Sequence, residues 1–286
     1  MGEGGRTMKT ILVPTESHEA IRPALETALM LARRFDSYIE GFALRFRVNE
    51  FVAVDMAGAI PLESLRDENL EEARRARQIF EAFMGERAVP RANAAASSLS
   101  YGWLDDAPEG ENFVGSYGRV FDVIVMSRPD ADTVAPYNRA IESGLFESGR
   151  PVLLSPPTAP KRIATNIMIH WNGSTEQARA NAFAMPLLHL AERVTVLTVV
   201  DGQDVPGPSA DQVRSQLRYN GIAAELASIE REGRSTGEAV LAAARTEGCD
   251  LLIKGAFTRN RLRQTIFGGA TSHIMHHADL PLFMAH

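Results

Sequence analysis

The stretch from Gly255 to His277, GAFTRNRLRQTIFGGATSHIMHH, is the part of this sequence that decides the fold of its second half. It follows an apolar run, DLLIK at residues 250–254, which predicts a short buried strand. It then carries three arginines, the pair Gly268 and Gly269, and a predicted helix. This order suits an anion, because glycine lets the backbone approach a ligand and the first N–H groups of a helix point at it. A plain strand-to-helix connection with a solvated basic rim stays the alternative, because glycine-rich turns are common.

Composition sets the broad class of protein. The 286 residues are 45% hydrophobic and 23% charged, which is typical of a globular chain with about two domains. A net charge of −6 argues against a general binder of nucleic acid or of anionic membranes. The single cysteine, Cys249, excludes a disulfide within the chain and fits a reducing cytoplasm, where we expect the protein to be. We find neither a signal peptide nor an apolar run of spanning length.

Strand and helix patterns alternate along the chain, twice over. In the first half, the predicted strands are residues 10–14, 38–44, 92–99, 122–127 and 151–155, and the predicted helices are 18–34, 63–87, 109–119 and 135–147. In the second half, the predicted strands are 166–170, 193–200, 223–229, 250–254 and 280–285, and the predicted helices start at Ser174, Ala210, Ser235 and after Gly269. Residues 46–62 look irregular, and a proline cluster at 156–160 predicts a linker.

The two halves can be laid on each other, with Ile11 matching Ile167 and Asp122 matching Asp250. Alternating strands and helices predict right-handed crossovers and a parallel sheet that is covered on both faces. We therefore expect an α/β fold with two tandem domains, at 8–156 and 162–286, each an open, mostly parallel five-stranded sheet. Ligands of such sheets bind beyond the carboxyl ends of the strands.

These residues resemble the universal stress protein family in its tandem two-domain form. The resemblance covers nearly the whole chain and rests on ILVPTESHEA at residues 11–20, on the element order, and above all on residues 250–286. Nucleotide-binding members of the family carry a glycine, two residues, a second glycine, nine residues, a third glycine and then a serine or threonine. The corresponding positions of this chain are Gly255, Thr258, Gly268 and Gly269.

The sequence departs from that motif in ways that bear on binding. Thr258 replaces a glycine, which costs about 1–2 kcal/mol where a positive φ is needed, and Gly269 replaces the hydroxyl residue. Where the family tends to have an aspartate after the first strand, this chain has Glu16 in the first half and Asn172 in the second. The first half lacks the glycine pair and carries Asp130 and Asp132 instead, which would repel phosphate. We expect the first half to be a degenerate domain that binds no nucleotide.

The resemblance implies an adenine nucleotide, ATP or a related one, in the second half. The expected binding residues are Trp171, Asn172, Val200, Lys254, Gly255, Thr258, Arg259, Gly268, Gly269, Ala270 and Thr271. Two of these residues could instead have a purely structural role. Trp171 would either stack on an adenine or pack against a neighbouring helix. Arg259, with Arg261 and Arg263, would either pair with phosphate or form a solvated rim.

Other patterns carry weaker signals. His273 and His277 share a helix face and could clip a metal, but an ordinary helix is the better reading, and we expect no metal. The charged helix 63–87 is either a solvated face or a partner surface. Because no nucleotide-hydrolase, serine-hydrolase or metalloprotease motif is present, we expect no catalytic residues.

The sequence thus predicts a non-enzymatic universal stress protein with a role in the stress response. The alternatives are an interaction scaffold that acts through dimer surfaces without nucleotide, and a slow ATP hydrolase. The short apolar runs 152–155 and 280–284 would invite aggregation as free edges, so we expect them to pair with each other inside one chain. Association into a homodimer stays open, and we expect neither nucleic acid nor membrane as a partner.

Overall fold

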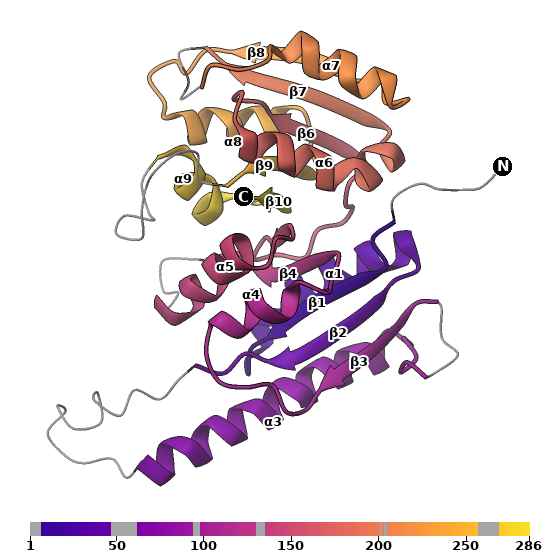
Figure 1. The fold of residues 1–286 in the computed structure, drawn as a ribbon, viewed down its shortest axis with the longest axis vertical. Coiled ribbons are helices and arrows are strands. Elements are labelled where there is room, and N and C mark those ends of the chain that lie inside the picture. The colour runs from indigo at the N-terminus through magenta and orange to yellow at the C-terminus, as the bar shows by residue number, and fades with distance from the viewer. Residues whose placement is uncertain are drawn as a thin grey trace, which may run out of the picture.

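The strands of both halves join into one sheet. The computed structural model describes residues 7–46, 62–93, 98–129, 135–200, 202, 205–256 and 269–286. In this part of the chain, ten strands follow the order β3-β2-β1-β4-β5-β10-β9-β6-β7-β8 (Figure 1). The first five are β1 (Thr10–Thr15), β2 (Tyr38–Ala43), β3 (Ser100–Leu104), β4 (Val123–Ser127) and β5 (Val152–Ser155). The second five are β6 (Asn166–His170), β7 (Arg193–Val199), β8 (Glu225–Ile229), β9 (Leu251–Gly255) and β10 (Leu282–Ala285).

Helices cover both faces of this sheet, as expected for the α/β class. Buried residues of α1 (Arg22–Phe35), which follows the short helix η1 (Glu19–Ile21), of α3 (Leu62–Glu86), α6 (Thr175–Leu190) and α7 (Ala210–Tyr219) belong to the core on one face. Buried residues of α4 (Asn112–Gly118), α5 (Ala135–Glu147), α8 (Thr236–Thr246) and α9 (Ala270–His277) belong to the core on the other face. The predicted fold class is confirmed.

The two halves repeat one strand arrangement. All pairs within a half are parallel, and β1 holds the same place between β2 and β4 as β6 holds between β7 and β9. Equivalent aspartates, one just before β4 and one just before β9, bond to the first residue of the neighbouring strand. Asp122 accepts a hydrogen bond from the backbone N–H of Thr10 at 3.0 Å, and Asp250 accepts one from that of Asn166 at 2.9 Å. The internal repeat of the sequence is therefore a repeat of structure.

The halves meet through β5 and β10, which pair antiparallel with Leu153 opposite Phe283. Every residue of both strands is buried. Pro281 lies just before β10, so its missing N–H interrupts no ladder bond, and its carbonyl accepts a hydrogen bond from Leu252 N at 3.0 Å.

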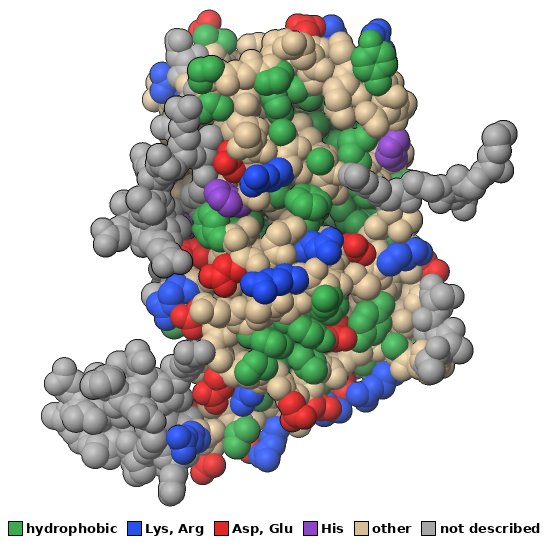
Figure 2. All heavy atoms as spheres, viewed as in Figure 1, with side chains coloured by type: hydrophobic (Ala, Val, Ile, Leu, Met, Phe, Trp, Pro, Cys, Tyr) green, Lys and Arg blue, Asp and Glu red, His purple; other side chains and the backbone are tan. Residues whose placement is uncertain are grey.

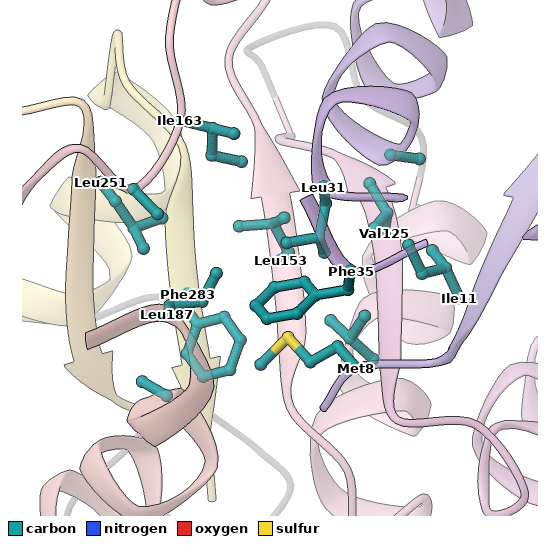
Figure 3. Packing of buried hydrophobic residues seen from close by; sticks show 14 of the residues in the cluster. Met8, Ile11, Leu31, Phe35, Val125, Leu153, Ile163, Leu187, Leu251 and Phe283 are labelled. Atoms are coloured by element: carbon teal, nitrogen blue, oxygen red, sulfur yellow. The ribbon is translucent and has the colours of Figure 1, made fainter. Parts of the chain in front are cut away.

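The core on the α1 and α6 face is continuous across this junction. Met8, Phe35 and Leu153 of the first half and Leu187 and Phe283 of the second half lie in one cluster of buried residues (Figure 3). Phe283 is fully buried, so its ring contributes on the order of 1.5–3 kcal/mol through burial.

One expected strand was wrong. The third strand is β3, not residues 92–99, and Arg91 makes only an isolated bridge with Tyr101. Residues 94–97 lie outside the described part of the chain, as do residues 47–61 of the stretch expected to be irregular. The physical reason is packing area: Tyr101 and Trp103 of β3 lie 5.9 and 5.3 Å, between ring centroids, from Phe80 on α3. Alanine offers far less surface for such contacts.

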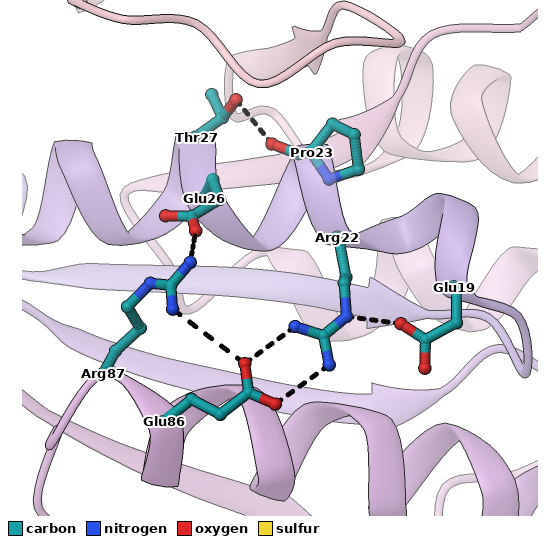
Figure 4. A network of polar contacts seen from close by, with 7 residues as sticks. All are labelled: Glu19, Arg22, Pro23, Glu26, Thr27, Glu86 and Arg87. Carbon is teal, nitrogen blue, oxygen red and sulfur yellow. Dashed lines mark hydrogen bonds and ion pairs between the residues drawn. The ribbon is translucent and has the colours of Figure 1, made fainter.

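Charged side chains on the exposed faces pair with one another. At the end of α3, Glu86 accepts from Arg22 at 2.8 Å, while Arg22 also binds Glu19 and Arg87 binds Glu26 (Figure 4). Such exposed pairs each contribute little to stability. Acidic and basic side chains are interspersed over the face drawn in Figure 2. None of the helices in the described ranges combines the length and the apolar character that crossing a membrane requires.

Cutting the linker tests the junction. We expect a chain cleaved at a protease site inserted between residues 156 and 162 to elute as one species in native gel filtration, because β5–β10 pairing and the shared core hold the halves together. Phe283→Ala, a loss of about 3–5 kcal/mol in a buried core, should let the cleaved halves separate. Separation of the cleaved halves without that substitution would contradict the shared core.

Candidate functional site

The site with the best geometry for a ligand lies at the carboxyl ends of β6 and β9. In the sheet, β6 has β7 on one side and β9 on the other, so the connections that leave β6 and β9 run in opposite directions. This divergence is the topological switch point at which parallel α/β sheets bind ligands. The loop after β6 and the end of β9 lie there, and α9 is the next described helix after β9 along the chain.

The loop after β6 is closed by contacts within the chain. The side chain of Trp171 is 6% exposed, packs in the core under α6 and α7, and donates through Nε1 to the carbonyl of Pro208 at 2.8 Å. The indole therefore packs in the core and presents no open surface on which an adenine could stack. Asn172 Oδ1 accepts hydrogen bonds from the Ser174 backbone N–H at 3.3 Å and hydroxyl at 2.8 Å. Ser174 in turn caps α6, as the sequence predicted.

Gly255 is held by a residue that sequence reasoning missed, Gln177 on α6. The Gly255 N–H donates to Gln177 Oε1 at 2.7 Å, and Gln177 Nε2 donates to the carbonyl of Ile253 at 3.4 Å and to Asn181 at 2.9 Å. A Cβ on Gly255 would lie 2.4 Å from the backbone nitrogen of Gln177. Glycine is needed at position 255 because α6 packs directly on the end of β9 and leaves no room for a side chain. The N–H of Gly255 is already bonded to Gln177. The sequence showed only that Ser174, three residues before Gln177, starts a helix, and gave no sign that Gln177 bonds to Gly255.

The first turn of α9 has a different character. Gly269 precedes the helix with φ 90° and ψ −170°, and no side chain among the described residues caps it. That φ favours glycine. Ala270 and Thr271 open the helix, so their N–H groups belong to the first turn, where a helix has no internal acceptors. Thr258, Arg259 and Gly268, with Arg261 and Arg263, lie outside the described residues.

Lys254 and Val200 complete the predicted set. Val200 follows β7, its side chain is 46% exposed, and its N–H donates to the Ile229 carbonyl at 2.8 Å. Lys254 is 3% exposed, and burial lowers its pKa to about 8. Since Ile253 and Gly255 face α6, strand alternation turns Lys254 to the α8 and α9 face. Lys254 and Trp171 are therefore separated by the sheet.

His170, the last residue of β6, is a second buried base that sequence reasoning missed. It is 3% exposed, and its Nδ1 has no hydrogen-bond partner within the described residues. Burial first, and then the nearby charge of Lys254, hold the pKa of His170 well below its ordinary value. The available signal was a histidine ending an otherwise apolar strand, NIMIH.

The histidines of α9 stack and bond to their own helix. The rings of His273 and His277 lie 4.2 Å apart, and Nδ1 of His277 is 2.8 Å from the His273 carbonyl. Burial, followed by the proximity of His277, lowers the pKa of His273. Within the described ranges, no three His, Cys, Asp or Glu side chains lie together in a way that could hold a metal ion.

The equivalent edge of the first half is built differently. Arg128, which follows β4, donates to the Pro129 carbonyl at 3.1 Å and to the carbonyl of His276 near the end of α9. Asp130 and Asp132 lie outside the described residues. This edge therefore contacts the second half instead of presenting a glycine loop.

Comparison with known proteins gives the class. Residues 164–286 match the model of the Universal stress protein family, which is the family that the sequence resembles. The whole chain is similar in fold to a universal stress protein from Archaeoglobus fulgidus, with 13% identity and a TM-score of 0.69 over 98% of this chain and 99% of that one. A proposed universal stress protein from Pseudomonas aeruginosa has 14% identity and a TM-score of 0.53 over 97% and 93%. No curated protein sequence matches the chain.

The Gln177 contact makes a direct stability prediction. Gln177→Ala leaves the buried Gly255 N–H without its acceptor, so we expect the free energy of unfolding to fall by about 1–3 kcal/mol in urea titration. Gln212→Ala, which removes an amide that caps α7 in an exposed position, should cost less. If both variants lose the same free energy of unfolding, the buried bonds of Gln177 stabilise the fold no more than an exposed helix cap does.

Burial of Lys254 predicts a pH dependence. Its folded pKa of about 8 lies below the ordinary 10.5, so the unfolded chain binds that proton more tightly. The free energy of unfolding should therefore rise between pH 8 and 10.5, and the full penalty should hold below pH 8. Lys254→Met should raise the free energy of unfolding by about 3 kcal/mol at pH 7 and flatten that rise. The exposed substitution Lys161→Met should do neither, and an unchanged slope in Lys254→Met would contradict the assignment.

Proposed function

We propose that the second half is an adenine-nucleotide-binding universal stress protein domain and that the chain acts in the stress response without catalysis. The ligand is ATP or a related adenine nucleotide, and the cytoplasm is the proposed compartment. The observation that carries this proposal is the first turn of α9. It begins at a glycine with positive φ, no described side chain caps it, and α9 is the next described helix after β9, whose end lies at the switch point of the sheet.

Electrostatics favour the phosphates at that turn. The N–H groups at the start of a helix carry a partial positive charge, and an anion of two or more negative charges gains most from it. Because the Gly255 N–H is bonded to Gln177, the phosphate contacts would come from Gly269, Ala270 and Thr271, and from the preceding loop with Thr258, Arg259 and Gly268. Gly255 then contributes by letting α6 approach.

The base and ribose would lie toward the end of β7. Val200 offers an exposed apolar side chain there, whereas Trp171 is buried with its indole N–H bonded. Asn172 would contribute by shaping the turn before α6. The first half, whose Arg128 is bonded to α9, would take no nucleotide and would serve as a structural partner.

The same closed contacts favour a second candidate, an interaction scaffold without nucleotide. Two groups that the resemblance implies for the ligand, the Gly255 N–H and the Trp171 indole, are bonded within the chain. A scaffold would act through surfaces between copies of the chain.

A melting experiment separates the two. With Mg-ATP at 100 times its Kd, binding should stabilise the protein by about 2.7 kcal/mol and raise its melting temperature. Thr271→Glu adds a negative charge to the first turn of α9, which suits the helix but repels phosphate, so it should abolish the shift while the protein stays folded. Thr271→Gln, which is neutral and of the same size, should keep most of it.

Three results would count against a nucleotide sensor. An absent shift, together with no nucleotide released when the purified protein is denatured, favours the scaffold. A shift that survives Thr271→Glu places the phosphates elsewhere. Phosphate release from ATP above background would make the domain a slow hydrolase.

A further inference from the structure

The two halves differ at one pair of equivalent buried positions. Ile11 on β1 pairs with Val123 on β4, and the equivalent Ile167 on β6 pairs with Leu251 on β9. Three residues further along each strand, the first half has Pro14 and Met126, and the second half has His170 and Lys254. Met126 is fully buried and Pro14 is buried. An apolar pair is therefore sufficient to build this part of the fold.

His170 and Lys254 are lateral neighbours. The register pairs Ile169 with Ile253, so the next residue along each strand, His170 or Lys254, lies beside the other on the α8 and α9 face. Leu197 on β7 flanks His170. On the other side, Met284 of β10 is paired with Lys254. Two bases thus stand side by side between two buried apolar residues.

Nothing in the described part of the chain balances them. Both side chains are 3% exposed, and no hydrogen bond or ion pair with a described residue reaches the Lys254 ammonium. The His170 Nδ1 has no partner either. No carboxylate contributes to the lowered pKa of either group, for which burial is the first cause. Burying one unpaired base is unfavourable, and burying two adjacent ones is more so.

An unfavourable arrangement at a functional edge points to a ligand. His170 ends β6, and Lys254 is followed by the last residue of β9, so both belong to the last layer of side chains before the carboxyl edge. An anion with several oxygens could accept from the ammonium and from the imidazole N–H at once. Phosphate has that chemistry, and a charge-assisted bond of this kind is stronger than a neutral one.

We propose that His170 and Lys254 form an anion-binding pair that takes a phosphate group at the switch point between β6 and β9. The proposal rests on the proposed function for the source of that group, a nucleotide. It goes beyond it by assigning binding to two residues outside the glycine loop. It also explains why the first half, with Pro14 and Met126, would lack the same capacity.

The test uses inorganic phosphate and pyrophosphate as probes on the full chain, at constant ionic strength, with affinity measured by calorimetry and by the shift in melting temperature. Lys254→Met places the residue of the first half at the equivalent position, so the variant should fold. We expect its affinity for pyrophosphate to fall at least about tenfold, which corresponds to about 1.4 kcal/mol. Lys161→Met removes the same charge from an exposed position and should bind as the unmodified chain does.

A second arm keeps the failure of this proposal apart from failure of the proposed function. Lys254→Met should weaken Mg-ATP by a similar factor and leave adenosine unaffected. In the unmodified protein, pyrophosphate should also shift the ring resonances of His170, identified by their loss in His170→Leu. The shift itself is measured on the unmodified protein, and the variant serves only to assign the resonances.

The outcomes are distinct. If Lys254→Met binds pyrophosphate and Mg-ATP as tightly as the unmodified chain, the pair is structural and this inference fails, while the nucleotide site stands. If the unmodified chain binds pyrophosphate in a Lys254-dependent way but binds no ATP, the inference stands and the nucleotide function fails. Binding of none of the probes by the unmodified chain would overturn the inference.

Discussion

Pairing between β5 and β10 is the constraint on which the rest of the structure depends. Each strand would be the edge of a five-stranded sheet, and each is buried along its whole length, so unpaired backbone groups there would be costly. Antiparallel pairing satisfies these groups and places Leu153 beside Phe283, which lets one core run through both halves. The antiparallel pairing also places the carboxyl ends of β4 and β9 on opposite edges of the sheet.

That opposition explains how the halves relate. The carboxyl edge of the first half faces the C-terminal end of α9, where Arg128 reaches the carbonyl of His276. The carboxyl edge of the second half faces away from that contact. One edge is thereby committed to holding the chain together, and the other can serve a ligand. The two halves thus share one fold but differ at their carboxyl edges.

At the second edge, close packing uses a backbone group that a bound phosphate would need. The Gly255 N–H, which a phosphate loop would use, is bonded to Gln177, because α6 begins directly against the end of β9. Lys254 and His170, on the other face of the sheet, have no such partner among the described residues. Their burial lowers both pKa values, so the arrangement sacrifices some stability.

The sequence by itself determined the order of strands and helices, the repeat, and local features such as the Ser174 cap and the positive φ of Gly221 after α7. These follow from contacts between residues a few positions apart, which a periodic pattern records. Only the tertiary structure decided that the third strand is β3, that Trp171 bonds to a residue 37 positions away, and that Gly255 bonds to one 78 positions away. The reason is physical: burial and partner choice depend on which elements the fold brings together, and a residue's neighbours in sequence do not specify that.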